Sequence, residues 1–158
     1  MDGNGSRFRG RRNSLIVYGK QVGEWVAERA GCPYDSRYSA AIGSQRNGVI
    51  HAGVIYTDWN KKSVVCHWAI SRGIDRAWLW YIHYYVFREL GAYKVIAPVN
   101  SDNVKMLRVA PKMGFVKEGQ LVDTQPSGDV VLFTLTADNC RFLGERYGKV
   151  RTRSARSA

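Results

Sequence analysis

The side chains best suited to chemistry at neutral pH are three histidines and three cysteines, and they lie far apart in the sequence. They are His51, His67 and His83, and Cys32, Cys66 and Cys140. No two histidines have the i, i+4 spacing of a helical metal site, and no two cysteines have the C-x-x-C spacing of a zinc or redox site. We therefore predict reduced thiols and no bound metal. A histidine can still act alone as a general base, because it titrates near neutral pH.

The net charge of +11 is concentrated at the two ends of the 158-residue chain. Residues 1–13 carry +3 and residues 144–158 carry +4, and both segments are rich in Gly, Ser and Arg. Such segments bury too little apolar surface to offset their ordering entropy. We predict a disordered basic arm at 1–13, a folded domain at 14–143 and a flexible basic tail at 144–158. The arm and tail could bind nucleic acid or an acidic protein weakly, or could simply be solvated.

The composition is that of one soluble globular domain, with 45% hydrophobic and 23% charged residues. A chain of this length can fold without disulfide or metal staples. No apolar run approaches the roughly 20 residues that span a bilayer, and no signal-peptide core follows the basic N-terminus. We predict a cytoplasmic protein without a membrane segment.

The first half of the sequence alternates between strand-like and helix-like patterns. Residues 15–18 are β-prone, and Val22, Trp25 and Val26 then recur at helical spacing before Gly31, which is a plausible stop. Three β-rich runs follow at 37–44, 49–59 and 63–71. Asn47-Gly48, between the first two runs, is a strong hairpin signal. These runs predict an antiparallel meander.

Residues 76–91 predict a helix that is apolar on nearly every side. Asp75 is a suitable N-cap and Gly91 a suitable stop. The aromatic side chains of this helix include Trp78, Trp80, Tyr81, Tyr84 and Tyr85. A helix of this kind is normally covered on more than one side. Its aromatic residues could be core, or could form a surface for a partner or for a second copy of the chain in a homodimer.

The second half of the sequence completes a mixed α+β pattern. Residues 93–101 predict a buried strand, 103–114 a helix, 115–125 a strand, 129–137 a last strand, and 138–148 one or two helical turns. The order is β-α-β-β-β-α-β-α-β-β, which is typical of an α+β layer fold and contains no internal repeat.

This order of elements, with "VNSDNVKMLRVAPKMGFVKEG" at 99–119, resembles the GNAT superfamily of N-acetyltransferases. It is most similar to the ribosomal-protein N-acetyltransferase type, whose motif runs Asn-x-x-Ser, an apolar helix, Lys-Leu-Gly-Phe and Glu-Gly. The matching positions are Asn103, Lys112, Gly114, Phe115, Glu118 and Gly119. The ending "GDVVLFTLTADNCRFL" also resembles that of short acetyltransferases from phage and prophage genomes. The resemblance covers about residues 15–143.

The resemblance implies a GNAT-like fold and a cofactor. The sheet would be mixed and mostly antiparallel, with six to seven strands, helices on both faces, and a splay between its fourth and fifth strands. Acetyl-CoA would enter that splay, with its pantetheine arm along the backbone of the fourth strand, including Ala69 and Ile70. Its pyrophosphate would rest on backbone N–H groups at the start of the next helix, where the helix dipole favours an anion.

The pyrophosphate loop matches the family motif only in part. The motif is Gln/Arg-x-x-Gly-x-Gly/Ala, and the best match is "RGIDRA" at 72–77, where Arg72 and Ala77 fit but Asp75 replaces the central Gly. A carboxylate beside a pyrophosphate repels it unless the side chain turns back to cap the helix. Arg72 and Arg76 would offset the repulsion, and Gly73 would supply backbone freedom.

Two catalytic positions of the family carry apolar residues in this chain. Ala110 stands where many members have the Tyr that protonates the leaving thiolate, and Met106 stands where the motif has Ser. Asn103 is then the one polar group in register. It would contact the cofactor or a bridging water, or would be a plain helix N-cap. Met106 is assigned to the wall of the cofactor channel.

His67 is the best-placed candidate for a general base, because the family's fourth strand runs beside the thioester. Strand alternation puts His67 on the face opposite Cys66, and the sequence leaves open which face meets the substrate. A lone histidine in a strand can equally be structural. Direct attack by an amine requires no covalent intermediate on Cys66.

The resemblance therefore implies an acetyl-CoA-dependent N-acetyltransferase that transfers acetyl to a primary amine by direct attack. A protein amine is favoured over a small-molecule amine, because the most similar motif type modifies protein N-termini. The alternative is a non-catalytic protein of the same fold that engages a protein or nucleic acid through its aromatic helix and Arg-rich ends.

Overall fold

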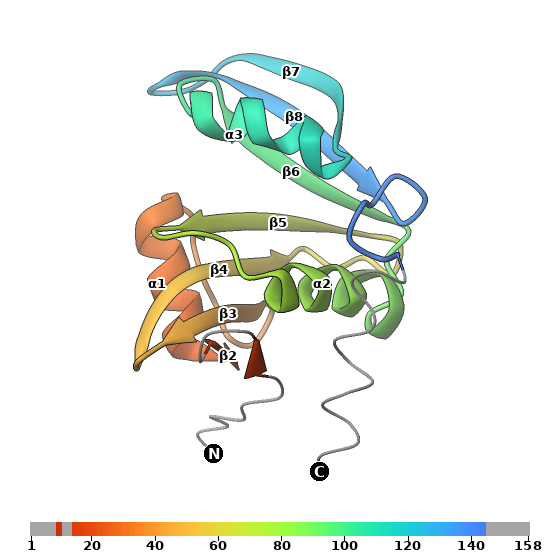
Figure 1. The fold of residues 1–158 in the computed structure, drawn as a ribbon. Coiled ribbons are helices and arrows are strands. Elements are labelled where there is room, and N and C mark those ends of the chain that lie inside the picture. The colour runs from red at the N-terminus through yellow and green to blue at the C-terminus, as the bar shows by residue number, and fades with distance from the viewer. Residues whose placement is uncertain (1–8, 11–13, 145–158) are drawn as a thin grey trace.

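The computed structural model describes residues 9–10 and 14–144, which form an α+β structure around one mixed sheet (Figure 1). The rest of the predicted basic arm and nearly all of the predicted basic tail lie outside the described residues. Within the described part, Arg9–Gly10 forms a two-residue strand, β1, that pairs with the start of the next strand.

The sheet has the order β1-β2-β3-β4-β5-β6-β8-β7. The longer strands are β2 Ser14–Tyr18, β3 Ala40–Arg46, β4 Val49–Thr57, β5 Ser63–Ile70, β6 Lys94–Asn100, β7 Val116–Gln125 and β8 Gly128–Thr136. These are the seven predicted strands, and β1 was not predicted. All neighbouring pairs are antiparallel except β5 and β6, which run parallel. The predicted α+β class and element order are confirmed.

Three helices cover the two faces of the sheet. They are α1 Lys20–Ala30, α2 Arg76–Tyr84 and α3 Val104–Val109. Side chains of α1 pack with one hydrophobic cluster, while α2 and α3 pack with the other, larger cluster on the opposite face. Figure 1 shows α3 grouped with β6, β7 and β8, and α2 grouped with β3, β4 and β5.

The hairpin between β3 and β4 forms where the Asn-Gly signal predicts it. Asn47 has φ 48° and Gly48 has φ 77°. A type I′ turn needs positive φ at both central residues, and Asn-Gly is the pair that adopts this geometry most readily. The turn sets the register in which His51 of β4 later faces the end of β5.

The aromatic helix is core, as the apolar pattern of its sequence indicated. Trp78 is fully buried and its Nε1–H donates to the Ile42 carbonyl oxygen at 3.2 Å, which fixes α2 on β3. Trp80 and Tyr81 are also buried. Their burial leaves these three rings no surface to offer to a partner. The helix continues beyond Tyr84 as a π-helical turn, Tyr85–Glu89.

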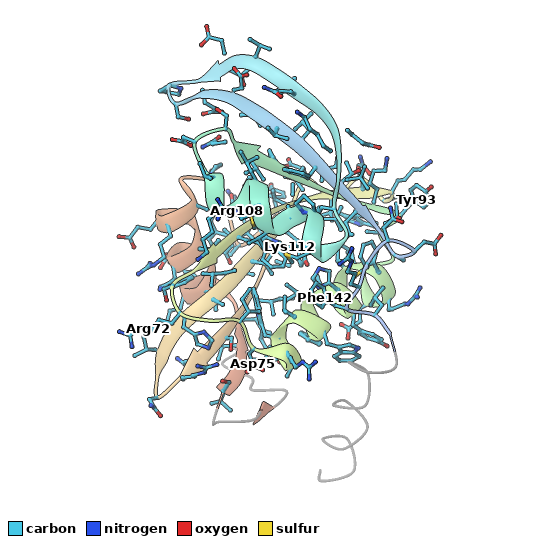
Figure 2. The ribbon with its side chains drawn as sticks, turned by 45° about the horizontal axis from the view of Figure 1, so that its top comes forward. Arg72, Asp75, Tyr93, Arg108, Lys112 and Phe142 are labelled. Carbon is cyan, nitrogen blue, oxygen red and sulfur yellow. The ribbon has the colours of Figure 1, made fainter. Side chains whose placement is uncertain are left out.

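Two predicted helical segments end differently from expectation. The helix predicted at 103–114 is α-helical only to Val109 and continues as a 3-10 turn, Ala110–Met113, because Pro111 has no N–H for the α-helical ladder. Residues 138–144 form turns instead of the predicted helix. Phe142 lies against His83 at 5.0 Å between ring centroids, so side-chain packing on α2 directs the path of this segment (Figure 2).

Gly114 is the residue that permits the junction between the 3-10 turn and β7. It has φ 103°, and a Cβ added there would collide with the backbone carbonyl oxygen of Asn139. Gly114→Ala should therefore lower the free energy of unfolding by about 3 kcal/mol or more, from left-handed strain plus steric overlap. Chemical denaturation of the purified variant measures this loss.

Gly91→Ala is the matched control, because Gly91 has φ 78° and a Cβ added there would have no neighbouring atom within 4 Å. Gly91→Ala should lower the free energy of unfolding by roughly 1–2 kcal/mol, from backbone strain alone. Equal losses in the two variants would contradict the close packing of Gly114 on Asn139.

Candidate functional site

The sheet opens between β5 and β6. These strands pair at only three positions, Ser63 with Lys94, Val64 with Val95 and Val65 with Ile96. β5 then continues to Ile70 and β6 to Asn100 without pairing to each other. The V-shaped separation is visible in Figure 1, and the predicted splay is confirmed. The edge of β5 from residue 66 to residue 70 therefore has no ladder partner on the β6 side.

Each of the separating strands is held by its outer neighbour. β5 pairs with β4 as far as Ile70, and β6 pairs with β8 as far as Asn100. Pro98 falls in the part of β6 that has lost β5, where a residue without N–H is tolerated. The opening is thus a fixed feature of the sheet.

The loop that follows β5 is fastened to β4 by His51. Nδ1 of His51 lies 3.0 Å from the Arg72 carbonyl oxygen, and Nε2 lies 2.9 Å from Ser44 Oγ. A neutral ring with Nδ1 protonated satisfies both contacts, since Nδ1–H donates to the carbonyl and Nε2 accepts from the hydroxyl. The His51 carbonyl oxygen also accepts from the N–H and Oγ–H of Ser71, at 2.8 Å and 3.1 Å. One buried residue therefore sets the position of the loop.

Asp75 turns back onto the helix that it precedes. Its Oδ1 accepts from the Ala77 N–H at 3.0 Å, which makes it the N-cap of α2. This is the orientation in which a carboxylate at this position interferes least with an anion. Arg72, Gly73 and Arg76 are exposed around it, and Gly73 has φ 55°.

Across the opening, α3 and the 3-10 turn that follows it present basic side chains. Lys105, Arg108 and Lys112 are exposed, and there is no acidic residue in the first turn of α3. Figure 2 shows Arg108 on α3, Lys112 on the 3-10 turn that follows it, and Arg72 and Asp75 at the approach to α2 on the other side. The entrance to the opening therefore carries positive charge from both sides, which suits a ligand with phosphate groups.

Asn103 and Met106 lie together at the start of α3. Asn103 Oδ1 accepts from the Met106 N–H at 3.2 Å, so Asn103 is an N-cap, and its Nδ2 is left for a ligand. Met106 is half-buried and packs against the core cluster, while Ala110 is buried. The two positions where the family often places hydroxyl groups thus present only apolar side chains.

Of the three histidines, His67 has the environment best suited to proton transfer. His51 is tied to a loop, and His83 is buried, donates from Nδ1 to the Leu79 carbonyl oxygen at 2.7 Å, and has its pKa lowered to about 4 by burial. His67 is half-buried and has no side-chain hydrogen bond to any described residue. Burial lowers the pKa of His67, and the negative charge of Asp58 partly offsets this effect.

His67 lies on the face of the sheet that α1 covers. It is opposite Ile55 in the β4–β5 register, and Ile55 packs with Val22 and Val26 of α1. Cys66 points to the other face, where burial raises the pKa of its thiol to about 12. A thiol in that state is not a nucleophile at neutral pH.

The structure gathers most of the predicted site residues around one opening. Those on the β5–α2 side are Ala69, Ile70, Arg72, Gly73, Asp75, Arg76 and Ala77, and those on the α3 side are Asn103 and Met106. His67 lies on the same strand, β5, with its side chain on the α1 face. His51 was missed because its contacts join residues 7 and 21 positions away. The basic side of α3 and of the 3-10 turn after it could have been predicted from the spacing of Lys105, Arg108 and Lys112.

Metal clusters and membrane-spanning helices are both absent from the described part of the chain. Among its residues, no group of three or more His, Cys, Asp or Glu side chains is arranged to hold a metal ion. No helix in residues 9–10 and 14–144 is long and apolar enough to cross a bilayer.

The fold is similar to those of solved N-acetyltransferases, whereas no family model and no curated protein sequence matches the chain. Ribosomal-protein-S5-alanine acetyltransferase from Vibrio fischeri matches with a TM-score of 0.62 and 14% identity, over 82% of this chain and 96% of that one. Spermidine/spermine N-acetyltransferase SpeG from Vibrio cholerae matches with a TM-score of 0.64 and 14% identity, over 78% and 92%. A GNAT-family acetyltransferase from Bacillus anthracis matches with a TM-score of 0.59 and 13% identity, over 83% and 98%. The chain therefore has the GNAT fold, as its sequence predicted.

The role of His51 in holding the loop can be tested by His51→Ala. Loss of the bond to the Arg72 carbonyl leaves that group and Ser44 without a partner, at a cost of about 1–3 kcal/mol. We expect backbone amides of residues 71–75 to exchange with deuterium at least tenfold faster, as measured by mass spectrometry. His67→Ala is the control and should leave exchange in this loop unchanged. Unchanged exchange in both variants would contradict the role of His51.

Proposed function

We propose that the protein is an acetyl-CoA-dependent N-acetyltransferase that acts by direct transfer to a primary amine. The observation that carries the proposal is the unpaired backbone of β5 from residue 66 to residue 70, inside a sheet and beside a basic entrance. Backbone polar groups need partners. An extended ligand with amide groups can supply them in the way an added strand does, and the pantetheine arm of acetyl-CoA is such a ligand.

The anionic end of the donor would lie at the entrance between α2 and α3. The Asp75 cap uses the Ala77 N–H, so the phosphates would be bound by the other N–H groups of residues 73–76 and by arginine. Arg72 and Arg76, which flank the loop before α2, would contribute from one side. Arg108 and Lys112 would contribute from the other. Asn103 Nδ2 would donate to the donor or to a bridging water.

The acceptor amine would approach from the α1 face, where His67 lies. Acetyl-CoA would supply the activated acetyl group. His67 would accept the proton that the amine loses as its nitrogen bonds to the carbonyl carbon, and N–H groups of the unpaired β5 edge would stabilise the oxygen. The C–S bond breaks and the thiolate takes its proton from solvent, because Ala110 and Met106 have none to give. A protein amine is favoured as acceptor, on the basis of the motif at 99–119.

The non-catalytic alternative assigns binding to the aromatic helix and to the Arg-rich ends of the chain. It relied on the aromatic helix as a binding surface, but Trp78, Trp80 and Tyr81 are buried. Asp75 in the pyrophosphate loop and Ala110 at the position of the family's Tyr are the features that still favour it.

Donor binding can be tested by charge reversal at the entrance. We expect acetyl-CoA to bind the wild-type protein in calorimetry. Arg72→Glu/Arg108→Glu should weaken binding at least tenfold, because the two cations lie on the two sides of the proposed phosphate site. Lys61→Glu/Arg141→Glu makes the same charge change at exposed positions away from the opening and should weaken binding less than threefold. No binding at millimolar acetyl-CoA would overturn the proposal. If acetyl-CoA binds, the acceptor can be identified by incubating the protein with isotopically labelled acetyl-CoA and cell extract. Mass spectrometry then detects the labelled product.

The pH profile tests His67 as the base. Its pKa lies below the ordinary value of 6.5, and the neutral ring is the active form, so kcat/KM should fall as pH drops through a value below 6.5. His67→Ala should reduce kcat/KM roughly a hundredfold or more and remove this limb. Added imidazole should restore part of the activity. Wild-type activity in the variant, with the same acid limb, would make His67 a structural residue.

A further inference from the structure

A second hollow lies at the end of α2 that is far from the predicted phosphate loop. This cavity of about 590 Å³ is bounded by the turn before β3, the β4–β5 loop and the π-helical turn that follows α2. α2 begins at the entrance of the V-shaped opening and its π-helical turn lies at the opposite end (Figure 1). The phosphate loop and the cavity therefore lie at opposite ends of this helix. We call the second one the aromatic cavity.

Four aromatic rings line the aromatic cavity. They are Tyr38, Tyr56, Trp59 and Tyr85. Tyr56 is buried, donates from its hydroxyl to the Ile82 carbonyl oxygen at 3.0 Å, and stacks on Tyr85 with 5.9 Å between centroids. Trp59 and Tyr38 are 37% and 73% exposed, so they form the accessible rim while the stacked pair forms the wall. Ring faces of this kind attract organic cations.

One carboxylate in the lining of the aromatic cavity has no ion-pair partner among the described residues. Arg37 and Asp58 are the charged residues that line it. The guanidinium of Arg37 is neutralised by Asp35, through contacts of 3.1 Å from Nε to Oδ1 and 2.7 Å from an Nη to Oδ2. The Asp58 carboxylate makes no hydrogen bond or ion pair with any described residue. Asp58 therefore offers an uncompensated charge beside the rings.

The loop that carries Asp58 and Trp59 is held in place before any ligand arrives. Asn60 Oδ1 accepts from the N–H groups of Lys62 and Ser63, at 3.0 Å and 2.8 Å, and its Nδ2 donates to Ser63 Oγ at 3.1 Å. Asp58 has φ 55°, a left-handed conformation that Asp tolerates better than most residues. A site fixed in this way binds without first having to order its loop.

A cation–π contact is already present in the lining of the aromatic cavity. The Arg37 guanidinium carbon lies 5.3 Å from the centre of the Tyr38 ring, which is the geometry of a cation–π contact. A single carboxylate among aromatic rings suits an organic cation better than a metal ion, because Ca²⁺ and Mg²⁺ require several oxygen ligands.

We propose that the aromatic cavity binds an organic cation, an alkylguanidinium or alkylammonium group, with its charge against Asp58 and its body against Trp59 and Tyr38. This binding requires no acetyl-CoA. Binding can therefore be measured whether or not acetyl transfer occurs, although Asp58 also acts on the pKa of His67, the proposed base.

The test uses butylguanidinium and its neutral, similarly shaped analogue butylurea, added to the isotopically labelled protein without acetyl-CoA. We expect the NMR signal of the Trp59 indole N–H to shift saturably with butylguanidinium and to respond at least tenfold more weakly to butylurea. Asp58→Asn should weaken butylguanidinium binding at least tenfold, because it keeps the shape and removes the charge. Asp138→Asn removes an exposed carboxylate elsewhere and should leave the affinity unchanged.

Three results would overturn the proposal. They are equal responses to the charged and neutral probes, unchanged affinity in Asp58→Asn, and absence of any saturable shift. Trp59→Ala provides a second variant, monitored by calorimetry, and should weaken binding at least fivefold. Circular dichroism of each variant establishes that the fold is intact.

Discussion

The structure depends on a pair of parallel strands that stays paired for only three residues. β5 and β6 separate after Val65 and Ile96, while β5 stays paired with β4 as far as Ile70 and β6 stays paired with β8 as far as Asn100. The unpaired backbone edge of β5 is therefore rigid and oriented before any ligand arrives, so binding along it would cost little ordering entropy. The same separation lets α2 and α3 stand on either side of one entrance. Both the basic rim and the exposed backbone follow from this single interruption of the sheet.

An interrupted sheet needs other contacts across its two halves, and an aromatic cluster supplies them. Trp68 of β5 contacts Trp78 and His83 of α2, with centroid separations of 5.5 Å and 5.8 Å. His83 in turn lies against Phe142, which follows β8 in the other half. Buried aromatic rings bring large apolar areas out of water, so the cluster stabilises the halves where ladder hydrogen bonds are absent. This role explains why α2 is apolar on nearly every side.

Local sequence signals predicted what depends on neighbours in the chain. The Asn47-Gly48 hairpin, the Asp75 cap and the order of ten elements could all be predicted, because turn chemistry, capping and hydrophobic period act over a few residues. The 3-10 turn after Val109 has a local cause as well, because Pro111 has no N–H for the α-helical ladder. The loop tether at His51 and the turns at 138–144 could not be predicted. They rest on contacts with Ser44, Arg72 and His83 that only the folded chain brings together.

The acid–base groups of the proposed reaction follow an energetic order. A primary alkylamine with a pKa near 10.4 must lose a proton before it attacks, which costs about 5 kcal/mol at pH 7. A thiol leaving group has a pKa of about 8.5, so its departure as the thiolate near neutral pH costs only about 2 kcal/mol. Having Ala110 in place of a general acid should therefore raise the barrier of the reaction less than loss of the base would. Deprotonating a protein N-terminal amine, with a pKa of about 8, costs only about 1 kcal/mol at pH 7. A half-buried histidine whose pKa is lowered is a weak base, and it suits an N-terminal amine better than a lysine.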